Sequence, residues 1–273
     1  MRIAVWNEPA VDVFAAALER SGAFDPASIL RGSRTECRDW LVRGEVDIAL
    51  VPTLTVIREE DFFDPLPAVA LSSWNYPFTE IVLHRGLGHA LHTIVFDPRY
   101  AQDVLLARIV LKEHYNMAPG FKPVDTTSVR TLLDQEADAA VIVNQSIVSD
   151  VPEATSLDLG REWFELTNYP LIWGVFVAQK GAATPAHVRA LIESAATAEQ
   201  ITESWIEEHV PHERFATFYT EHMRYRLDDL ATASLTSLQD YLYYYLATDD
   251  IPSITFYQVP EEEEDSTNPR PLV

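Results

Sequence analysis

The stretch Gly44-Glu45-Val46-Asp47-Ile48-Ala49-Leu50-Val51-Pro52-Thr53 decides the fold of this chain. Its apolar run, 46–51, follows an acidic turn and ends at a proline, which predicts a fully buried strand of a parallel sheet. A similar stretch, Glu136-Ala137-Asp138-Ala139-Ala140-Val141-Ile142-Val143-Asn144, recurs at an offset of 91 residues. The recurrence indicates that the chain contains two related α/β units.

The same offset aligns further segments of the two units. It places 3–7 on 94–98 and 35–41 on 126–132, so each copy is predicted to run strand, helix, strand, helix, strand. Two such copies predict an α/β fold with two lobes, each built on a mixed sheet flanked by helices, that face each other across a cleft.

The order of the predicted elements also suggests domain boundaries. We expect lobe one to comprise residues 1–88 together with the C-terminal helices in 177–258, and lobe two to comprise residues 89–176. Residues 259–273 contain the run Glu261-Glu262-Glu263-Glu264-Asp265 and show no helix or strand pattern. We therefore expect a disordered acidic tail.

The composition limits the classes of partner. With 273 residues, of which 47% are hydrophobic, the chain can bury a proper core, and this excludes global disorder. A net charge of -22 argues against binding to nucleic acid or to an anionic membrane surface. Most of this charge is expected on a solvated surface. A small anionic substrate would require a cleft that is locally neutral or positive.

Cysteine content and the N-terminus indicate the compartment. Cys37 is the only cysteine, so the chain has no disulfide framework, and its place on a predicted helix favours a buried thiol. The chain enters a strand at Ile3 without the features of a signal peptide, and no apolar run approaches the roughly 20 residues of a membrane span. These features predict a cytoplasmic protein.

Candidate site residues follow from the position of the strands. In α/β lobes, ligands bind outside the carboxyl ends of parallel strands. That rule selects Asn7 and Thr53 in the first copy and Arg99, Asn144 and Gln145 in the second. They form repeat-related pairs, as a cleft between two lobes requires.

Some of these residues have a second interpretation. The amide of Asn7 either caps the helix that follows or faces a substrate, and Arg99 either binds a carboxylate or faces solvent. The group of His84, His89 and His92 is interpreted as solvated loop histidines rather than as a metal site, because no fixed secondary structure holds them. We predict no metal and no cofactor.

Beyond these patterns, the chain resembles the chorismate dehydratases of the futalosine route to menaquinone, which have a two-lobed periplasmic-binding-protein type 2 fold. The resemblance covers nearly the whole chain in order, up to about residue 250. Its motifs are Trp6-Asn7-x-Pro9, the 44–53 strand, Phe78-Thr79-Glu80-Ile81-Val82-Leu83, Asp158-Leu159-Gly160-x-x-Trp163, Leu166-Thr167-x-x-Pro170 and Tyr219-Thr220-x-x-x-Arg224-Tyr225-x-Leu227.

The resemblance implies a lyase that removes water from chorismate and leaves an enolpyruvyl-substituted benzoate. It implies a small anionic substrate and no metal or redox cofactor. It also implies that Asn7 takes part in abstracting the ring proton. Since an amide is a poor base in water, we expect Asn7 to orient or assist while a substrate carboxylate takes the proton.

The resemblance also marks substrate-binding positions, several of which depart from the family pattern. Thr79 stands where the family usually has serine, and Gln102 and Asp103 belong to a Tyr-Ala-Gln-Asp run that replaces Ser-x-Thr-Ser. Asn144-Gln145 replaces Gly-Asp, and Thr167 opens Thr-Asn-Tyr-Pro where the family has Thr-Gly-Leu-Pro. The second copy departs further than the first. The alternative function is a non-catalytic cytosolic binding protein of the same fold for a small anionic or polar ligand.

Overall fold

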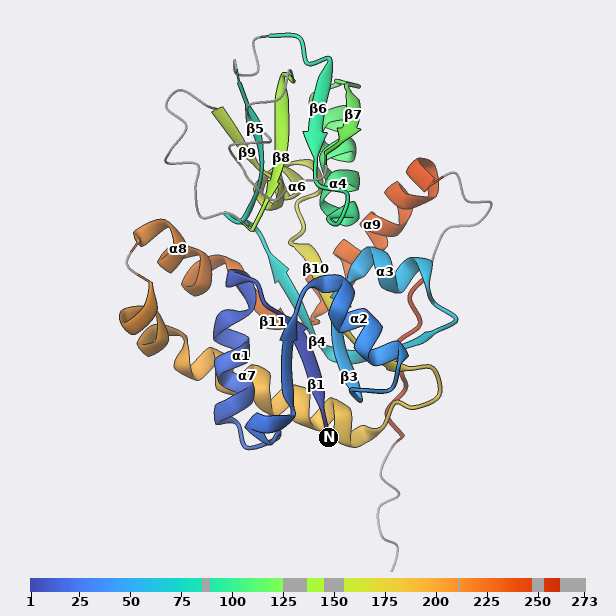
Figure 1. Ribbon diagram of the computed structural model, residues 1–273, viewed down its shortest axis with the longest axis vertical. Coiled ribbons are helices and arrows are strands. Elements are labelled where there is room, and N and C mark those ends of the chain that lie inside the picture. The colour runs from blue at the N-terminus through green and yellow to red at the C-terminus, as the bar shows by residue number, and fades with distance from the viewer. Residues whose placement is uncertain (85–88, 125–136, 145–154, 211, 247–252, 261–273) are drawn as a thin grey trace, which may run out of the picture.

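Two sheets, each covered by helices, lie one above the other in the computed structural model (Figure 1). The structure describes residues 1–84, 89–124, 137–144, 155–210, 212–246 and 253–260. The N-terminus lies at the far end of the lower lobe, and the strands β4 and β10 reach from that lobe toward the upper one.

The first sheet has six strands and forms the lower lobe. β1 pairs in parallel with β2 and β3, and β10 pairs antiparallel with β3 and β4. β4 pairs in turn with β11, also antiparallel. In sheet order the strands are β11 (Met223–Arg226), β4 (Phe63–Ser73), β10 (Leu171–Gln179), β3 (Ile48–Pro52), β1 (Ile3–Trp6) and β2 (Ile29–Gly32).

The second sheet has five strands and forms the upper lobe. β6 pairs in parallel with β7 and β8, whereas β5 pairs antiparallel with β8 and β9. In sheet order the strands are β7 (Gly120–Pro123), β6 (Thr93–Phe96), β8 (Ala139–Val143), β5 (Thr79–Leu83) and β9 (Thr155–Asp158).

The two sheets confirm the internal repeat. The order β2-β1-β3 of the first sheet is matched by β7-β6-β8 of the second, and every pair within each trio is parallel. All five residues of β3 and all five of β8 are buried, as the apolar runs predicted. The helix predicted at 127–133, within the second copy, lies outside the described residues.

Two strands differ from the predicted domain boundaries. β5 was expected in lobe one, but its hydrogen-bond partners β8 and β9 place it in the second sheet. Most of β10 was expected in lobe two, but its partners β3 and β4 place it in the first sheet. The reason is that both strands are antiparallel additions after a lobe crossing. Their apolar sequences fit either sheet, and only tertiary pairing decides between them.

Helices cover both sheets. They are α1 (Asp12–Arg20), α2 (Arg34–Val42), α3 (Thr53–Arg58), α4 (Ala101–Glu113), α6 (Leu159–Thr167), α7 (Pro185–His209), α8 (Glu213–Thr217) and α9 (Asp229–Leu246), with short 3-10 turns Pro9–Val11 and Pro26–Ser28 and a π-turn Phe218–His222. In the described parts of the chain, none of the helices is both long and apolar enough to span a membrane.

Helix α2 brings a charged residue to the carboxyl edge of the first sheet. Its N-cap Ser33 and Glu36 form a reciprocal capping box, and Gly44, with φ of 70°, follows its C-terminal end. Because α2 begins directly after β2, its first residue Arg34 stands where β2 ends. The buried Cys37 lies in the same helix, and burial raises the pKa of its thiol to about 12.

The tyrosine-rich segment of α9 is partly a packing face. Tyr241 packs edge-on against the buried Trp163 of α6 with ring centroids 5.6 Å apart. The hydroxyl of Tyr245 donates to Glu113 of α4 at 2.8 Å, whereas Tyr244 is exposed. Of the predicted acidic tail, 259–273, residues 261–273 lie outside the described residues.

Candidate functional site

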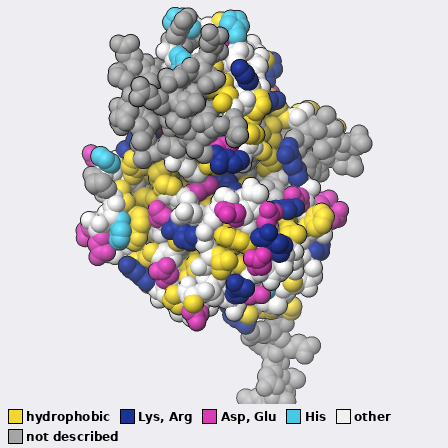
Figure 2. Space-filling model, viewed as in Figure 1, with side chains coloured by type: hydrophobic (Ala, Val, Ile, Leu, Met, Phe, Trp, Pro, Cys, Tyr) yellow, Lys and Arg dark blue, Asp and Glu magenta, His cyan; other side chains and the backbone are white. Residues whose placement is uncertain are grey.

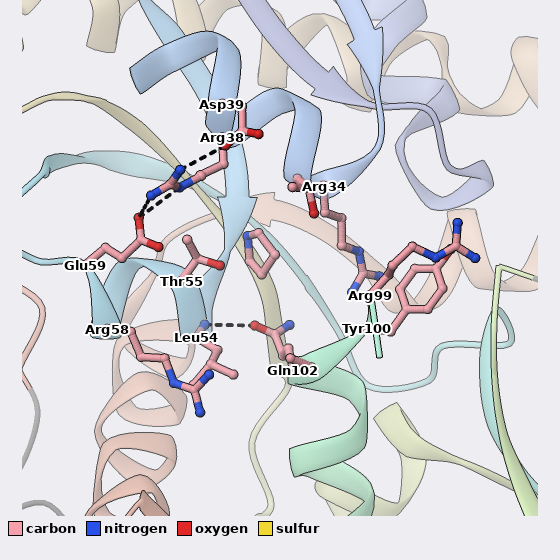
Figure 3. Close-up of a pocket in the computed structure, with 13 residues that line it drawn as sticks. Arg34, Arg38, Asp39, Leu54, Thr55, Arg58, Glu59, Arg99, Tyr100 and Gln102 are labelled. Carbon is pink, nitrogen blue, oxygen red and sulfur yellow. Dashed lines mark hydrogen bonds and ion pairs between the residues drawn. The ribbon is translucent and has the colours of Figure 1, made fainter. Parts of the chain in front are cut away.

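A cavity of about 340 Å³ lies where the two lobes meet. Helices α2 and α3 of the lower lobe and the first turn of α4 of the upper lobe form its walls (Figure 3). A volume of this size is within the range of small-molecule sites. The residues that line it are Arg34, Thr35, Arg38, Asp39, Pro52, Leu54, Thr55, Arg58, Glu59, Arg99, Tyr100, Ala101 and Gln102.

The lining of this cavity is positive although the protein is strongly acidic. It contains four arginines against two carboxylates, whereas the whole chain carries a net charge of -22. Arg38 donates to Glu59 at 2.9 Å and to Asp39 at 2.9 Å (Figure 3). Arg58 makes no hydrogen bond or ion pair with any described residue, and basic side chains gather on this face at the lobe junction (Figure 2). Such a lining attracts small anions.

A buried ionic cluster lies behind the cavity and joins the lobes. Arg34 Nε and Nη2 donate to the two oxygens of Glu8 at 2.8 and 3.0 Å, and Nη1 donates to Asp103 Oδ2 at 2.5 Å. The side chain of Arg34 is 5% exposed and that of Asp103 is 0% exposed. Glu8 and Arg34 belong to the lower lobe, whereas Asp103 belongs to α4 of the upper lobe.

Aromatic rings enclose this cluster. The guanidinium of Arg34 lies 4.8 Å from the ring centroid of Trp6 and 5.4 Å from that of Tyr100. Tyr76 stacks on Trp173 with centroids 3.7 Å apart. Trp6 Nε1 and the Tyr76 hydroxyl are buried, and neither has a hydrogen-bond partner among the described residues. Two polar groups therefore lie unused beside the charges.

The charges shift one another's protonation equilibria. Burial lowers the pKa of Arg34, but the charges of Asp103 and Glu8 outweigh burial and hold that pKa well above its ordinary value. Burial raises the pKa of Asp103, and the nearby charge of Glu8 adds to the rise while Arg34 opposes it. Burial is thus the main cause of the raised pKa of Asp103, and the second carboxylate, Glu8, adds to it.

Three predicted site residues meet at the lobe junction. Thr79 Oγ1 donates to Asp103 Oδ1 at 3.2 Å, although Thr79 was expected in lobe one and lies on β5 of the second sheet. Gln102 accepts from the backbone N–H of Leu54 at 2.9 Å and donates to the carbonyl of Trp173 at 2.8 Å. Consecutive residues of α4 thus hold the upper lobe against the lower one.

Three others do not line the cavity. Asn7 is exposed at the end of β1, where its backbone N–H donates to Gly32 at 2.7 Å, and the next helical turn begins without a side-chain cap. The capping interpretation of Asn7 is therefore wrong. The hydroxyl of Thr53 donates to the carbonyl of Ile172 at 2.8 Å. The hydroxyl of Thr167 donates to the carbonyl of Trp163 at 2.8 Å. Both threonine hydroxyls are therefore hydrogen-bonded to the backbone.

The remaining predictions concern the upper lobe. Arg99 lies on the cavity rim with a side chain 56% exposed, and its Nε donates to Asp97 Oδ1 at 2.9 Å. Asn144 adopts a left-handed backbone, with φ of 58°, and its backbone N–H donates to the carbonyl of Phe78 at 2.6 Å. Its side-chain oxygen is buried without a hydrogen-bond partner among the described residues. Gln145 lies outside the described residues.

The sequence analysis missed Glu8, Arg34 and Arg58. Glu8 is the second residue after β1 and Arg34 the second after β2, so the rule of carboxyl strand ends applies to both. Arg58 is the last residue of α3, a whole helix beyond the end of β3, so the rule does not select it. Its place in the cavity follows only from how α3 packs.

Solved structures define the class of protein to which this fold belongs. The chain is similar to protein AF1704 from Archaeoglobus fulgidus, with a TM-score of 0.64 and 20% identity, over 90% of this chain and 98% of that one. It is also similar to the alkanesulfonate-binding protein SsuA from Xanthomonas axonopodis pv. citri, bound to MOPS, with a TM-score of 0.65 and 14% identity, over 93% and 96% of the two chains. For the periplasmic aliphatic sulphonate binding protein SsuA from Escherichia coli the TM-score is 0.62 at 12% identity, over 96% and 95%.

These similarities show the periplasmic-binding-protein fold, with two mixed sheets and flanking helices, as predicted. A family model identifies the chain more narrowly. It describes menaquinone biosynthesis and matches residues 1–244. The chain belongs to this menaquinone biosynthesis family, and the expected link to that pathway is confirmed.

Proposed function

We propose that the protein is a carbon–oxygen lyase that dehydrates chorismate to an enolpyruvyl-substituted benzoate. The observation that carries the proposal is the family match over residues 1–244. The cavity at the lobe junction supports it, because four arginines in its lining suit a substrate with two carboxylates.

The reaction is an elimination that balances without an oxidant or a reductant. A ring C–H bond and the C–O bond of the ring hydroxyl break, a ring double bond forms, and the proton and hydroxide leave as one water. The residues must hold the carboxylates, assist proton removal and keep bulk water away. In this proposal Arg58 and Arg99 attract the carboxylates at the rim of the cavity, and the interlobe bonds of Gln102 close it from behind.

Asn7 is the residue proposed to assist proton removal. It precedes Glu8, whose carboxylate is held in the buried cluster, and Asn7 itself is exposed at the end of β1. Since an amide is a weak base, its role is to orient the substrate while a substrate carboxylate takes the proton.

The test is incubation of the purified protein with chorismate, followed by ultraviolet detection of the aromatic product. Asn7→Ala is expected to abolish turnover while the thermal unfolding temperature changes little, because the side chain is exposed. Ser204→Ala is the matched control, since Ser204 is an exposed polar residue of α7. It is expected to keep full turnover.

The alternative is a non-catalytic binding protein of the same fold. The exposed position of Asn7, outside the residues that line the cavity, favours this second candidate. Thermal stabilisation by chorismate without any product, at low and at high salt, would support it and would overturn the lyase.

A further inference from the structure

We propose that Arg34 binds a carboxylate of the substrate and that Asp103 occupies the place of this carboxylate in the free protein. The inference rests on the proposed function for the substrate class, a small aromatic or cyclic dicarboxylate. In this inference the lower lobe binds the substrate carboxylate, and Asp103 of the upper lobe competes with that carboxylate for Arg34.

The first support is how Asp103 meets Arg34. The carboxylate comes from the opposite lobe and receives two donors, Arg34 Nη1 at 2.5 Å and Thr79 Oγ1 at 3.2 Å. The other two nitrogens of the guanidinium, Nε and Nη2, donate to Glu8, which fixes the plane of the fork. Only the Asp103 side of the guanidinium is shared between lobes, so only this contact can be exchanged when the lobes separate.

The second support is the state of the surrounding groups. The Tyr76 hydroxyl, which lies within the electrostatic reach of all three charges, and Trp6 Nε1 are buried without a partner. Because buried polar groups usually have a hydrogen-bond partner, a bound ligand or a water can use these two. They are available to a bound carboxylate in addition to the guanidinium.

The third support is access. Arg34 belongs to the lining of the cavity as well as to the buried cluster, and Tyr100 and Gln102 stand beside it in the same wall. An anion in the cavity therefore meets Arg34 directly. Because Gln102 and Asp103 are neighbours on α4, withdrawal of Asp103 also strains the bonds of Gln102 to Leu54 and Trp173. Ligand entry and the interlobe contact are thus coupled.

A purely structural ion pair is the competing explanation. It accounts for the contact between Arg34 and Asp103 but predicts no effect on ligand affinity beyond loss of one negative charge. The two explanations differ in the size of that effect and in its dependence on Arg34, and both can be measured.

The experiment measures binding of benzene-1,3-dicarboxylate and of benzoate to the full chain by titration calorimetry. Asp103→Asn keeps the shape of the side chain and its ability to hydrogen-bond Thr79, but it replaces the ion pair with Arg34 by a hydrogen bond from the guanidinium to a neutral acceptor. We expect the dicarboxylate to bind about tenfold more tightly, the difference between these two kinds of hydrogen bond. Benzoate is expected to gain by a similar factor, because the exchange involves one carboxylate.

Glu59→Gln is the matched control. It removes one negative charge from the same cavity lining without touching Arg34, because Glu59 pairs with Arg38. We expect it to change affinity by less than about threefold, as for a partly exposed pair. In Arg34→Lys and in the double variant Arg34→Lys, Asp103→Asn, we expect the tenfold gain to disappear, since lysine offers a point charge in place of the fork.

Three outcomes would overturn the proposal. The first is an equal gain in dicarboxylate affinity from Asp103→Asn and Glu59→Gln, and the second is a gain from Asp103→Asn that persists with lysine at position 34. The third is the absence of dicarboxylate binding to every variant. The proposed lyase function is scored separately by chorismate turnover. If Asp103→Asn gains affinity but the wild type does not turn over chorismate, the carboxylate exchange stands and the lyase function is rejected. If the wild type turns over chorismate but Asp103→Asn gains no affinity, the lyase function stands and the carboxylate exchange is rejected.

Discussion

Arg34, Glu8 and Asp103 show how much of the site depends on single charged residues. A buried ion pair costs desolvation that its attraction only partly returns, so such groups are weak evidence for stability alone. Here the three side chains connect two lobes, and the two carboxylates lie behind a cavity to whose lining Arg34 belongs. The arrangement favours exchange of one carboxylate for another.

Asp158 carries a prediction on pH at the residue scale. Its carboxylate accepts from the backbone N–H groups of Tyr76 and Arg161, with Glu80 of β5 and Arg214 of α8 as charged neighbours. Burial raises its pKa from 3.8 to about 6. The folded state therefore keeps a proton that the unfolded state releases, so the free energy of unfolding falls as pH rises from about 4 to 6.

Chemical denaturation of the wild type and of Asp158→Asn across this pH range checks the prediction. The asparagine still accepts the backbone bonds but does not titrate, so its stability profile is expected to be flatter between pH 4 and 6. Glu165→Gln, an exposed change on the same helix, should leave the profile as in the wild type. Parallel profiles for the wild type and Asp158→Asn would contradict the assignment.

At the scale of elements, helix α6 fits closely against the crossing between the lobes. A Cβ added to Gly160 would lie 2.9 Å from the backbone nitrogen of Tyr76 and 3.0 Å from the carbonyl carbon of Asn75. These are backbone atoms, so the crossing segment itself must shift. The closeness of α6 thus helps to set the position of Tyr76 beside the ionic cluster.

Gly160→Ala is expected to destabilise the protein by about 1–3 kcal/mol, because overpacking outweighs the better helix propensity of alanine. Gly120→Ala on the edge strand β7 is the control, since its nearest contact would be 3.4 Å from the carbonyl of His92. We expect that control to stay within about 0.5 kcal/mol of the wild type. Urea titration measures both, and equal stabilities of the two variants would contradict the packing argument.

At the scale of the whole molecule, charge sets the response to salt. A net charge of -22 on 273 residues makes the folded state repel itself. The Debye length falls from about 10 Å at 0.1 M salt to about 3 Å at 1 M. We expect the thermal unfolding temperature to rise across that range of sodium chloride.

Sucrose at the same osmolality separates screening from general solvent exclusion, since it carries no charge. The rise in sodium chloride should exceed that in sucrose. An unfolding temperature that falls with salt, or that rises equally in both solutes, would show that self-repulsion is not the dominant electrostatic effect.

The sequence by itself determined the repeat, the two lobes and the candidate strand ends. Local periodicity and turn chemistry were sufficient for this. The sequences of the buried strands β3 and β8 are short apolar runs, and Gly44 follows the end of a helix. The family resemblance likewise followed from ordered motifs, and the match over residues 1–244 confirms it.

Only the tertiary structure decided which lobe each crossing strand joins and which side chains meet at the junction. β5 and β10 are apolar enough for either sheet, so their place depends on hydrogen-bond partners distant in the sequence. The contact of Arg34 with Asp103 joins positions 69 residues apart. No local sequence pattern encodes such a pair. It forms only when packing removes both charges from water, so that each charged group needs the other as a partner.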